Sequence, residues 1–222
     1  MCDGGVAIFV KTPGLSPLKT RLAAGLGRAA AEQWYRLAAS AVAAAASRVP
    51  GLTAYWAVAE ASPDAHAAWP GLPLLAQGEG ELGARMGRVH ATLLERHGFA
   101  LLLGADTPQV DPARLAQAAD WLAADEPRLV MGPARDGGFW LLGANRNPAP
   151  GDWLRTACGR DDTARGFRDA MARHGEWLTL PTLTDVDEAT DLGPMLDELA
   201  LLARPLAEQV RLGEWTRALP AR

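Results

Sequence analysis

Runs of apolar residues short enough for strands alternate with longer stretches of helical periodicity along most of the chain. The strand-like runs lie at 6–10, 53–59, 99–106, 128–134, 137–144 and 176–181. The helical patterns lie at about 28–48, 81–98, 111–124 and 161–175, and again from about 189 to 217, while 145–153 is irregular. A continuous apolar run such as 99–106 is typical of a strand buried on both faces, so we expect parallel pairing.

This alternation predicts an α/β fold of three layers, with a mostly parallel central sheet between two layers of helices. Because 222 residues with 49% hydrophobic content are enough for one sizeable core, we expect a single domain over 1–222. Ligands of such sheets bind beyond the carboxyl ends of the strands. Four segments that follow strands carry unusual residues, at 11–21, 104–108, 132–138 and 184–192.

Charge and cysteine content argue against several classes of function. A net charge of -4 and a pI near 5.6 lack the basic surface that nucleic-acid binding usually leaves. The two cysteines, Cys2 and Cys158, suggest neither a disulfide framework nor a cysteine zinc site, which fits a reducing cytoplasm. The apolar run at 6–10 is too short for an export signal, and the Ala-rich stretch at 37–47 is too short to cross a membrane. We therefore expect a cytoplasmic protein with small-molecule partners.

Positive charge is almost entirely arginine, with twenty Arg against two Lys, and both lysines follow the first strand. Lys11 and Lys19 flank a Gly/Pro loop that leads into a helix, where backbone N–H groups and cations converge. A compact, rotatable ammonium suits moving phosphates in a way that the rigid fork of Arg does not. We therefore expect a phosphate site, although any one cation alone is more simply a solvated charge on a turn. It is not a Walker A loop, because Pro13 and Leu18 stand where that motif needs glycine.

Three aspartates that follow apolar strands are candidates for a divalent-metal site. Asp106 ends the run at 99–106, where its carboxylate can reach a hard cation shared with phosphates. Asp185 and Asp187 follow the last strand, and either can supply a second carboxylate from across the sheet. The alternative for each aspartate is a turn or helix cap, and we expect Asp111, before a proline, to be such an N-cap.

The segment 132–138 is a candidate for contact with a ligand. Arg135 and Asp136 precede the paired glycines Gly137 and Gly138, which allow a backbone to approach a ligand closely. A tight hairpin turn explains the same Asp-Gly pair equally well.

The segment 77–89 combines three glycines in a loop with Arg85 on the first turns of a helix. Gly83 and Arg85 are placed to hold a base or a phosphate there. A flexible loop with a solvated Arg is an equally good interpretation of this stretch alone.

Five motifs in a fixed order carry a family resemblance. They are FVKTPGLSPLKTRL (9–22), QGEGELGARM (77–86), GADTPQVDP (104–112), GPARDGGFWLLG (132–143) and DVDEATDL (185–192). Over residues 6 to about 200 the chain resembles a bacterial family of the nucleotide-diphospho-sugar transferase superfamily, domain of unknown function 2064, labelled glycosyltransferase in arsenosugar-biosynthesis contexts. The resemblance implies a GT-A-like, Rossmann-related fold, with a nucleotide-diphosphate and divalent-metal site at the first loop and the GAD motif.

The same motifs are also similar to those of 2-phospho-lactate guanylyltransferase and molybdenum-cofactor nucleotidyltransferases. Glycosyltransferases of this fold often carry Asp-x-Asp, whereas in this chain Thr107 follows Asp106. Asp185 or Asp187 would therefore have to supply the second carboxylate for the metal.

These observations predict a metal-dependent glycosyltransferase that moves a sugar from a nucleotide-diphosphate sugar to a small-molecule acceptor. We expect Asp106 and Asp187 to hold Mg²⁺ or Mn²⁺. The predicted catalytic residues are Asp106, Asp136 and Lys19, with Asp136 as the base that activates an acceptor hydroxyl. The predicted nucleotide-binding residues are Lys11, Thr12, Gly14, Lys19, Thr20, Arg21, Gly83 and Arg85. The predicted acceptor-binding or sugar-binding residues are Arg135, Gly137 and Gly138.

Two alternatives stay open from the sequence. The first is a nucleotidyltransferase, in which a phosphorylated acceptor attacks an NTP and pyrophosphate leaves while the lysines neutralise the β- and γ-phosphates. The second is a binding protein that has kept the fold and lost the chemistry. The C-terminal helices are compatible with covering the sheet or with forming a homodimer.

Overall fold

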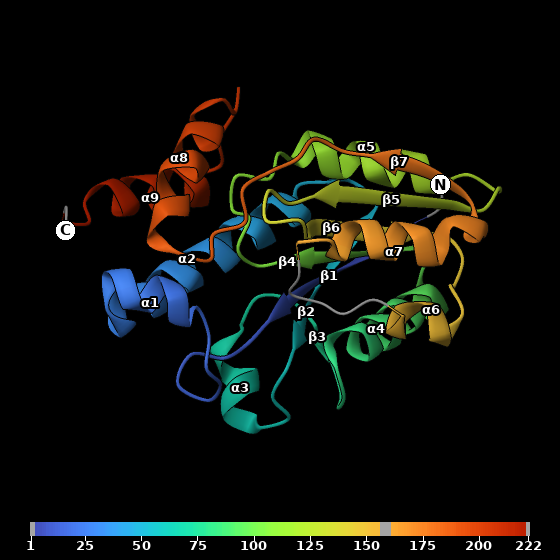
Figure 1. The fold of residues 1–222 in the computed structure, drawn as a ribbon, viewed down its shortest axis with the longest axis horizontal. Helices are drawn as coiled ribbons and strands as arrows, with labels where there is room; N and C mark the ends of the chain where they lie inside the picture. Colours follow the sequence, from blue (N-terminus) through green and yellow to red (C-terminus); the bar gives the residue numbers. More distant parts are fainter. Residues whose placement is uncertain (1–2, 156–160, 221–222) are drawn as a thin grey trace.

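A seven-stranded sheet lies at the centre of the computed structural model, which describes residues 3–155 and 161–220 and so leaves Cys2 and Cys158 outside (Figure 1). The strand order is β3-β2-β1-β4-β6-β5-β7. The strands are β1 (Gly4–Val10), β2 (Leu52–Val58), β3 (Leu74–Ala76), β4 (Phe99–Gly104), β5 (Arg128–Pro133), β6 (Phe139–Ala144) and β7 (Glu176–Thr179). Within the described ranges, every pair of neighbours is parallel except β4 with β6 and β5 with β6. The predicted mostly parallel sheet is therefore confirmed.

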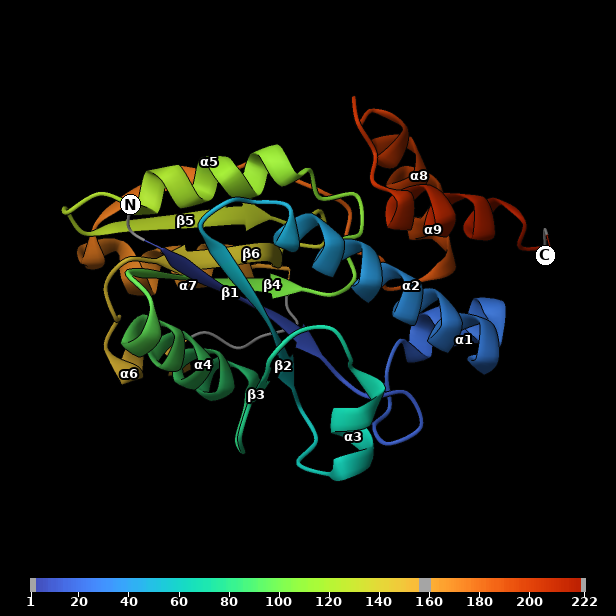
Figure 2. The same ribbon diagram turned by 180° about the vertical axis from the view of Figure 1, so that it is seen from behind.

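Helices cover both faces of this sheet (Figure 2). They are α1 (Thr20–Leu26), α2 (Arg28–Ser47), α3 (Pro63–Ala68), α4 (Leu82–Arg96), α5 (Pro112–Leu122), α6 (Pro150–Leu154), α7 (Thr163–Met171), α8 (Leu192–Ala200) and α9 (Ala207–Arg217), with 3₁₀ turns at Ala172–His174 and Ala189–Asp191. Side chains of β1 alternate between the two layers, so that Ile8 packs in the core shared with α2 and α5, and Ala7 in the core shared with α4, α6 and α7. The predicted three-layer α/β/α arrangement is confirmed.

The sequence pattern does not predict α3, β3 or α6. The strand β3 has three residues and pairs only with β2, while α3 has six residues and is capped by Ser62, whose Oγ accepts a hydrogen bond from Ala65 N. The helix α6 begins at Pro150, inside the stretch expected to be irregular. Each element is too short to show a hydrophobic period of its own. The expected parallel pairing of 99–106 holds for β4 with β1, but is wrong on the other side, where β4 pairs antiparallel with β6.

Two turns that follow β4 and β5 have the structure that their sequences indicate. Asp111 caps α5, since its Oδ1 accepts a hydrogen bond from Ala113 N at 2.9 Å. The antiparallel strands β5 and β6 are joined by a hairpin in which Gly138 N donates to Asp136 Oδ1 at 2.9 Å and Gly137 has φ +87°. The hairpin interpretation of the Asp-Gly pair is therefore confirmed.

The C-terminal helices α8 and α9 lie beyond the sheet, next to α1 and α2 (Figures 1 and 2). Gln209 of α9 is fully buried and its Nε2 donates to Pro108 O and Val110 O, both at 2.9 Å, in the segment that follows β4. Among the residues that the structure describes, no helix has both the length and the apolar character needed to cross a membrane. The single domain, the cytoplasmic location and the homodimer stay predictions.

Candidate active site

The carboxyl ends of β1 and β4 open into a cleft of about 520 Å³. Its walls come from the loop after β1, the start of α4, the segment after β4 and the segment before the 3₁₀ turn at Ala189–Asp191. Many of the residues singled out in the sequence line it, namely Lys11, Lys19, Thr20, Arg21, Arg85, Asp106 and Asp187. The fold thus brings cations from the first loop and from α4 to the same place as two of the candidate metal carboxylates.

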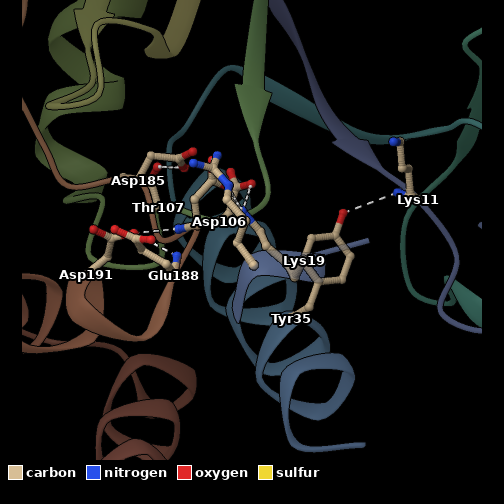
Figure 3. A network of polar contacts seen from close by, with 10 residues as sticks. Lys11, Lys19, Tyr35, Asp106, Thr107, Asp185, Glu188 and Asp191 are labelled. Atoms are coloured by element: carbon tan, nitrogen blue, oxygen red, sulfur yellow. Dashed lines mark hydrogen bonds and ion pairs between the residues drawn. The ribbon is translucent and has the colours of Figure 1, made fainter. Parts of the chain in front are cut away.

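Lys19 is the residue before α1, and its side chain extends into a group of carboxylates (Figure 3). Its Nζ lies 2.6 Å from Asp106 Oδ2 and 2.8 Å from Asp187 Oδ1, and its side chain is only 6% exposed. Lys19 has φ +44° and is the one non-glycine residue with positive φ in the described chain. That backbone conformation costs about 1–2 kcal/mol, which the two charge-assisted contacts offset.

A third carboxylate, that of Asp185, joins this group. One oxygen each from Asp106, Asp185 and Asp187 lie within 4.8 Å of one another. Thr107 Oγ1 donates a hydrogen bond to Asp185 Oδ1 at 3.2 Å, which orients that carboxylate. Three converging carboxylate oxygens are the ligands that Mg²⁺ and Mn²⁺ prefer, so the residues present fit a hard divalent cation. The sequence left either Asp185 or Asp187 as the partner of Asp106, and the fold places both beside it.

The pKa values in this group reflect burial and mutual charge. Burial would lower the pKa of Lys19, but the Asp106, Asp185 and Asp187 carboxylates outweigh it and raise that pKa above its usual range. Burial would raise the pKa of Asp106, but the Lys19 ammonium holds it below its ordinary value. Burial and the neighbouring Asp106 carboxylate raise the pKa of Asp185. The raised pKa of Asp185 indicates that Lys19 does not offset its burial and its repulsion by Asp106, and a divalent cation beside these oxygens would offset both.

Two cations of the cleft have no carboxylate partner among the described residues. The Lys11 side chain is exposed and lies on the other side of Tyr35 from the carboxylates, while Lys11 N donates to Tyr35 Oη at 3.2 Å (Figure 3). Arg85 Nη1 donates to Gln77 Oε1 at 2.9 Å, and Arg85 Nε is buried without a hydrogen-bond partner in the described chain. Because a partly buried guanidinium with no counter-charge and an unpartnered Nε is costly, Arg85 favours an anion in the cleft.

The two remaining cleft residues from the sequence lie at its edge. Arg21 pairs through Nη2 with Asp187 Oδ2, and its side chain is 67% exposed. Thr20, the first residue of α1, is exposed and lines both the cleft and a hollow on the other side of the first loop.

Three predicted nucleotide-binding residues lie elsewhere. Thr12 is buried at the start of the loop, where its N donates to both carboxylate oxygens of Glu60 at 3.0 Å and its Oγ1 accepts from Trp69 Nε1 at 3.1 Å. Gly14, with φ +90°, lines the hollow behind the loop. A Cβ at Gly83 would lie 2.1 Å from the carbonyl oxygen of Trp153, so this glycine allows α4 to approach α6. Thr12 and Gly83 make packing contacts and Gly14 lines an open hollow, while the roles of all three in nucleotide binding stay predictions.

The predicted acceptor residues divide between two environments. Arg135 points toward α8, with its guanidinium 2.9 Å from Glu198 Oε1 and its Nε 3.1 Å from Thr184 Oγ1. A Cβ at Gly137 would lie 1.9 Å from the carbonyl oxygen of Asp161, so backbone packing requires this glycine. Asp136 and Gly138 line a second cavity of about 190 Å³, together with Asp185.

Sequence reasoning missed the residues that position the site. Glu198 of α8 accepts hydrogen bonds from Thr184 N at 2.8 Å and from Gln109 Nε2 at 2.8 Å, in addition to its Arg135 pair. Gln77 follows β3, and its Nε2 donates to Val10 O and Ala57 O at 3.2 and 2.8 Å, which joins the ends of β1 and β2. A polar Gln77 directly after three apolar residues indicates the end of a strand. Glu198 lies within a helical pattern that contains other charged residues, so the sequence did not single it out.

Comparison with solved structures identifies the class of fold. A protein from Desulfovibrio desulfuricans G20, provisionally described as a nucleotide-diphospho-sugar transferase, shares 24% identity, with 99% of this chain and 97% of that one covered and a TM-score of 0.85. CMP:2-keto-3-deoxy-manno-octonic acid synthetase complexed with CTP shares 13% identity over 92% of this chain and 100% of its own, with a TM-score of 0.57. Rv0371c from Mycobacterium tuberculosis H37Rv, complexed with manganese, shares 18% identity over 89% and 100%, with a TM-score of 0.54. The fold is therefore one that nucleotide-sugar transferases and nucleotidyltransferases share.

The sequence itself identifies the family. The model of DUF2064, described as "Uncharacterized protein conserved in bacteria", matches residues 37–157, just over half of the chain. The protein belongs to this family, which confirms the resemblance carried by its motifs. No curated protein matches the chain by sequence.

Proposed function

We propose that the protein is a metal-dependent glycosyltransferase that moves a sugar from a nucleotide-diphosphate sugar to a small-molecule acceptor. The observation that carries the proposal is the division of charge in one cleft. Asp106 and Asp187 line the cleft around the Lys19 ammonium, with Asp185 beside them, and Lys11 and Arg85, which have no carboxylate partner among the described residues, line the same cleft. A nucleoside diphosphate that is bound with a divalent cation needs both halves of this arrangement.

Each group has a separate task in this proposal. Asp106, Asp185 and Asp187 would hold Mg²⁺ or Mn²⁺, which when bound neutralises charge on the departing nucleoside diphosphate. Lys11 and Arg85 would bind the phosphates, with Arg85 oriented by Gln77 and Lys11 free to rotate toward them. In the ligand-free protein Lys19 binds carboxylates, and it lines the cleft in which the phosphates of the donor would bind.

Asp136 is the candidate base for the acceptor hydroxyl. Its carboxylate is exposed in the hairpin between β5 and β6, and lines the second cavity together with Asp185. Asp136→Asn keeps an acceptor for the hydrogen bond from Gly138 N while removing the base, so we expect it to lower kcat by about a hundredfold or more with little change in the donor KM. A variant with full turnover would remove Asp136 from this role.

A nucleotidyltransferase is the second candidate, because the CMP:2-keto-3-deoxy-manno-octonic acid synthetase with bound CTP has the same fold. In that reaction the hydroxyl or phosphate of an acceptor attacks the α-phosphate of an NTP and pyrophosphate leaves. Lys11 and Arg85 would then bind the β- and γ-phosphates.

Thermal unfolding with a panel of NTPs, NDPs and NDP-sugars, each with Mn²⁺ and with chelator, tests both candidates. A ligand that binds only the native protein stabilises it by about 2.7 kcal/mol at a hundredfold excess over its dissociation constant. We expect the largest metal-dependent stabilisation from an NDP-sugar. A largest effect from an NTP would favour nucleotidyl transfer, and no metal-dependent effect from any nucleotide would contradict both proposals.

A further inference from the structure

The second cavity differs chemically from the cleft that it adjoins. The two share Phe9, Leu82 and Gly104, so an occupant of the cavity would lie next to an occupant of the cleft. Most of the cavity wall is apolar, and its large side chains are Phe9, Leu82, Met86, Leu102, Leu103 and Phe139. Its charged groups are the carboxylates of Asp136 and Asp185.

The described part of the cavity wall is unsuited to a phosphorylated occupant. Within the described residues, no Lys, Arg or His lines the cavity, whereas Lys11, Lys19, Arg21 and Arg85 all line the cleft. Against the described wall, a phosphate in the cavity would lose its water shell to apolar side chains and would face the Asp136 carboxylate with no described cation beside it. The phosphates of the donor therefore belong in the cleft, and the cavity favours an uncharged group.

The volume of the cavity indicates how large a group it can enclose. At about 190 Å³ it is slightly larger than an apolar protein cavity of about 150 Å³ that binds benzene. One ring or a branched alkyl group of similar volume fills such a space. A hydrated monosaccharide would leave most of its hydroxyl groups unpaired against Met86, Leu102 and Phe139.

We propose that this cavity binds the acceptor, and that the acceptor is an uncharged alcohol with an aromatic or branched apolar body. The inference rests on the proposed glycosyltransferase function and names its acceptor class. The body of the alcohol packs between α4 and β6, and its hydroxyl faces Asp136 and Asp185. In the transfer, the acceptor oxygen forms a bond to the anomeric carbon, the bond from that carbon to the diphosphate oxygen breaks, Asp136 takes the hydroxyl proton, and the electron pair leaves with the nucleoside diphosphate.

Titration of the whole protein with benzyl alcohol, followed by saturation-transfer NMR, tests the site without a known donor. We expect binding that Met86→Gln weakens by about tenfold, because the substitution replaces an apolar wall by an amide of similar size. The matched control is Met171→Gln, because Met171 is equally buried in the same apolar core and lines neither cavity. We expect the control to change the affinity by less than about twofold.

A second pair of variants serves if glutamine at a buried position prevents folding. Leu82 and Leu74 are 38% and 37% exposed, and only Leu82 lines the cavity, so Leu82→Ser should weaken binding and Leu74→Ser should not. Glycerol 3-phosphate, glucose and the four common ribonucleosides are the competitors. Displacement of benzyl alcohol by any of them at similar concentration would overturn the inference, and so would equal affinities for Met86→Gln and Met171→Gln.

The thermal-shift panel separates this inference from the proposed function. Nucleotide stabilisation with Mn²⁺ should persist in Met86→Gln, because Met86 does not line the cleft. If the protein binds nucleotide but Met86→Gln leaves its affinity for benzyl alcohol unchanged, the acceptor inference alone is overturned. Benzyl alcohol binding that depends on Met86, in a protein that binds no nucleotide, would overturn the glycosyltransferase proposal.

Discussion

Lys19 makes the contacts that a bound metal ion would also make. Its ammonium lies within 2.8 Å of both Asp106 and Asp187, and the third carboxylate of the group belongs to Asp185. An ammonium and a divalent cation cannot both occupy the space between these oxygens. We therefore propose that Lys19 competes with a divalent cation for these oxygens and would become available to phosphate once the cation binds.

Replacement of Lys19 by Met should separate these effects. We expect Lys19→Met to lower the free energy of unfolding without metal by about 3 kcal/mol, because the half-buried carboxylates then repel one another. Mn²⁺ alone should bind about tenfold more tightly, which corresponds to one charge-assisted hydrogen bond that no longer competes. The affinity for nucleotide in the presence of Mn²⁺ should fall. Isothermal titration with Mn²⁺ and then with nucleotide measures both.

Arg21→Met is the matched control for this prediction. Arg21 also contacts Asp187, but its side chain is 67% exposed, against 6% for Lys19. We expect a much smaller change in Mn²⁺ affinity, because the interaction of an exposed pair is screened by water. Equal Mn²⁺ affinities for Lys19→Met and the unmodified protein would show that Lys19 does not compete with the metal.

At the residue scale, the chemistry of the site could be predicted further than its geometry. The scarcity of lysine identified Lys11 and Lys19, and both line the cleft. The sequence could not show that Tyr35 lies between the two side chains, because Tyr35 comes from α2 and only the packing of that helix on β1 brings it there. For the same reason the pattern could not show that Arg135 turns away toward Glu198.

At the scale of elements, α8 holds the segment that carries two of the three carboxylates. Glu198 accepts hydrogen bonds from the N and Oγ1 of Thr184, the residue before Asp185, and pairs with Arg135 of the β5–β6 hairpin. Its side chain is 13% exposed. We infer that Glu198 is a positioning residue, because it contacts neither cavity and fixes the backbone from which Asp185 and Asp187 project.

The stability that Glu198 contributes should depend on pH. Burial would raise the pKa of Glu198, but hydrogen bonds from Thr184, Gln109 and Arg135 hold it below its ordinary value of 4.5. A depressed carboxyl pKa stabilises the folded state above the unfolded pKa, and this contribution is lost as the pH falls through the lower folded value. We expect Glu198→Gln to cost about 2 kcal/mol at pH 7 and much less at pH 3. Urea unfolding at both pH values measures the difference.

Metal affinity distinguishes positioning from general stability in this variant. Glu198→Gln should weaken Mn²⁺ binding at a temperature where the protein is fully folded, since Asp185 and Asp187 lose a fixed backbone. Glu214→Gln on α9 is the control, because Glu214 is exposed and makes no ion pair in the described chain. A cost of Glu198→Gln that is the same at pH 3 and pH 7 would contradict the charge-based explanation.

Element prediction succeeded where a hydrophobic period extends over several turns. The helices α2, α4, α5 and α7 and six of the strands match patterns read from the sequence. The strand β3 and the helices α3 and α6 have three, six and five residues, so their positions are decided by tertiary contacts rather than by their own periodicity. The sequence did not predict the antiparallel direction of β6, because its Asp-Gly pair fitted a hairpin turn and a ligand-binding loop equally well.

At the scale of the whole molecule, the site lies at one end of the sheet and is built from segments far apart in the sequence (Figure 1). The loop at 11–21, the segment at 104–107 and the segment at 184–188 meet around the carboxylates. The helices α8 and α9 lie outside the second and third of these segments and hold them in place by hydrogen bonds. The turns at 48–51 and 123–127 precede β2 and β5 and lie at the opposite end of these strands. Ligand binding should therefore order one end of the molecule only.

Hydrogen exchange followed by mass spectrometry tests this expectation. With Mn²⁺ and the nucleotide that stabilises the protein most, amide exchange at 11–21, 104–107 and 184–188 should slow by roughly tenfold or more, while 48–51 and 123–127 should not change. Mn²⁺ alone should protect 104–107 and 184–188 but leave 11–18 unprotected, because phosphate and not metal binds the cations of the first loop. Protection of 11–18 by Mn²⁺ alone, or of 123–127 by nucleotide, would show that the cleft between β1 and β4 is not where the two ligands meet.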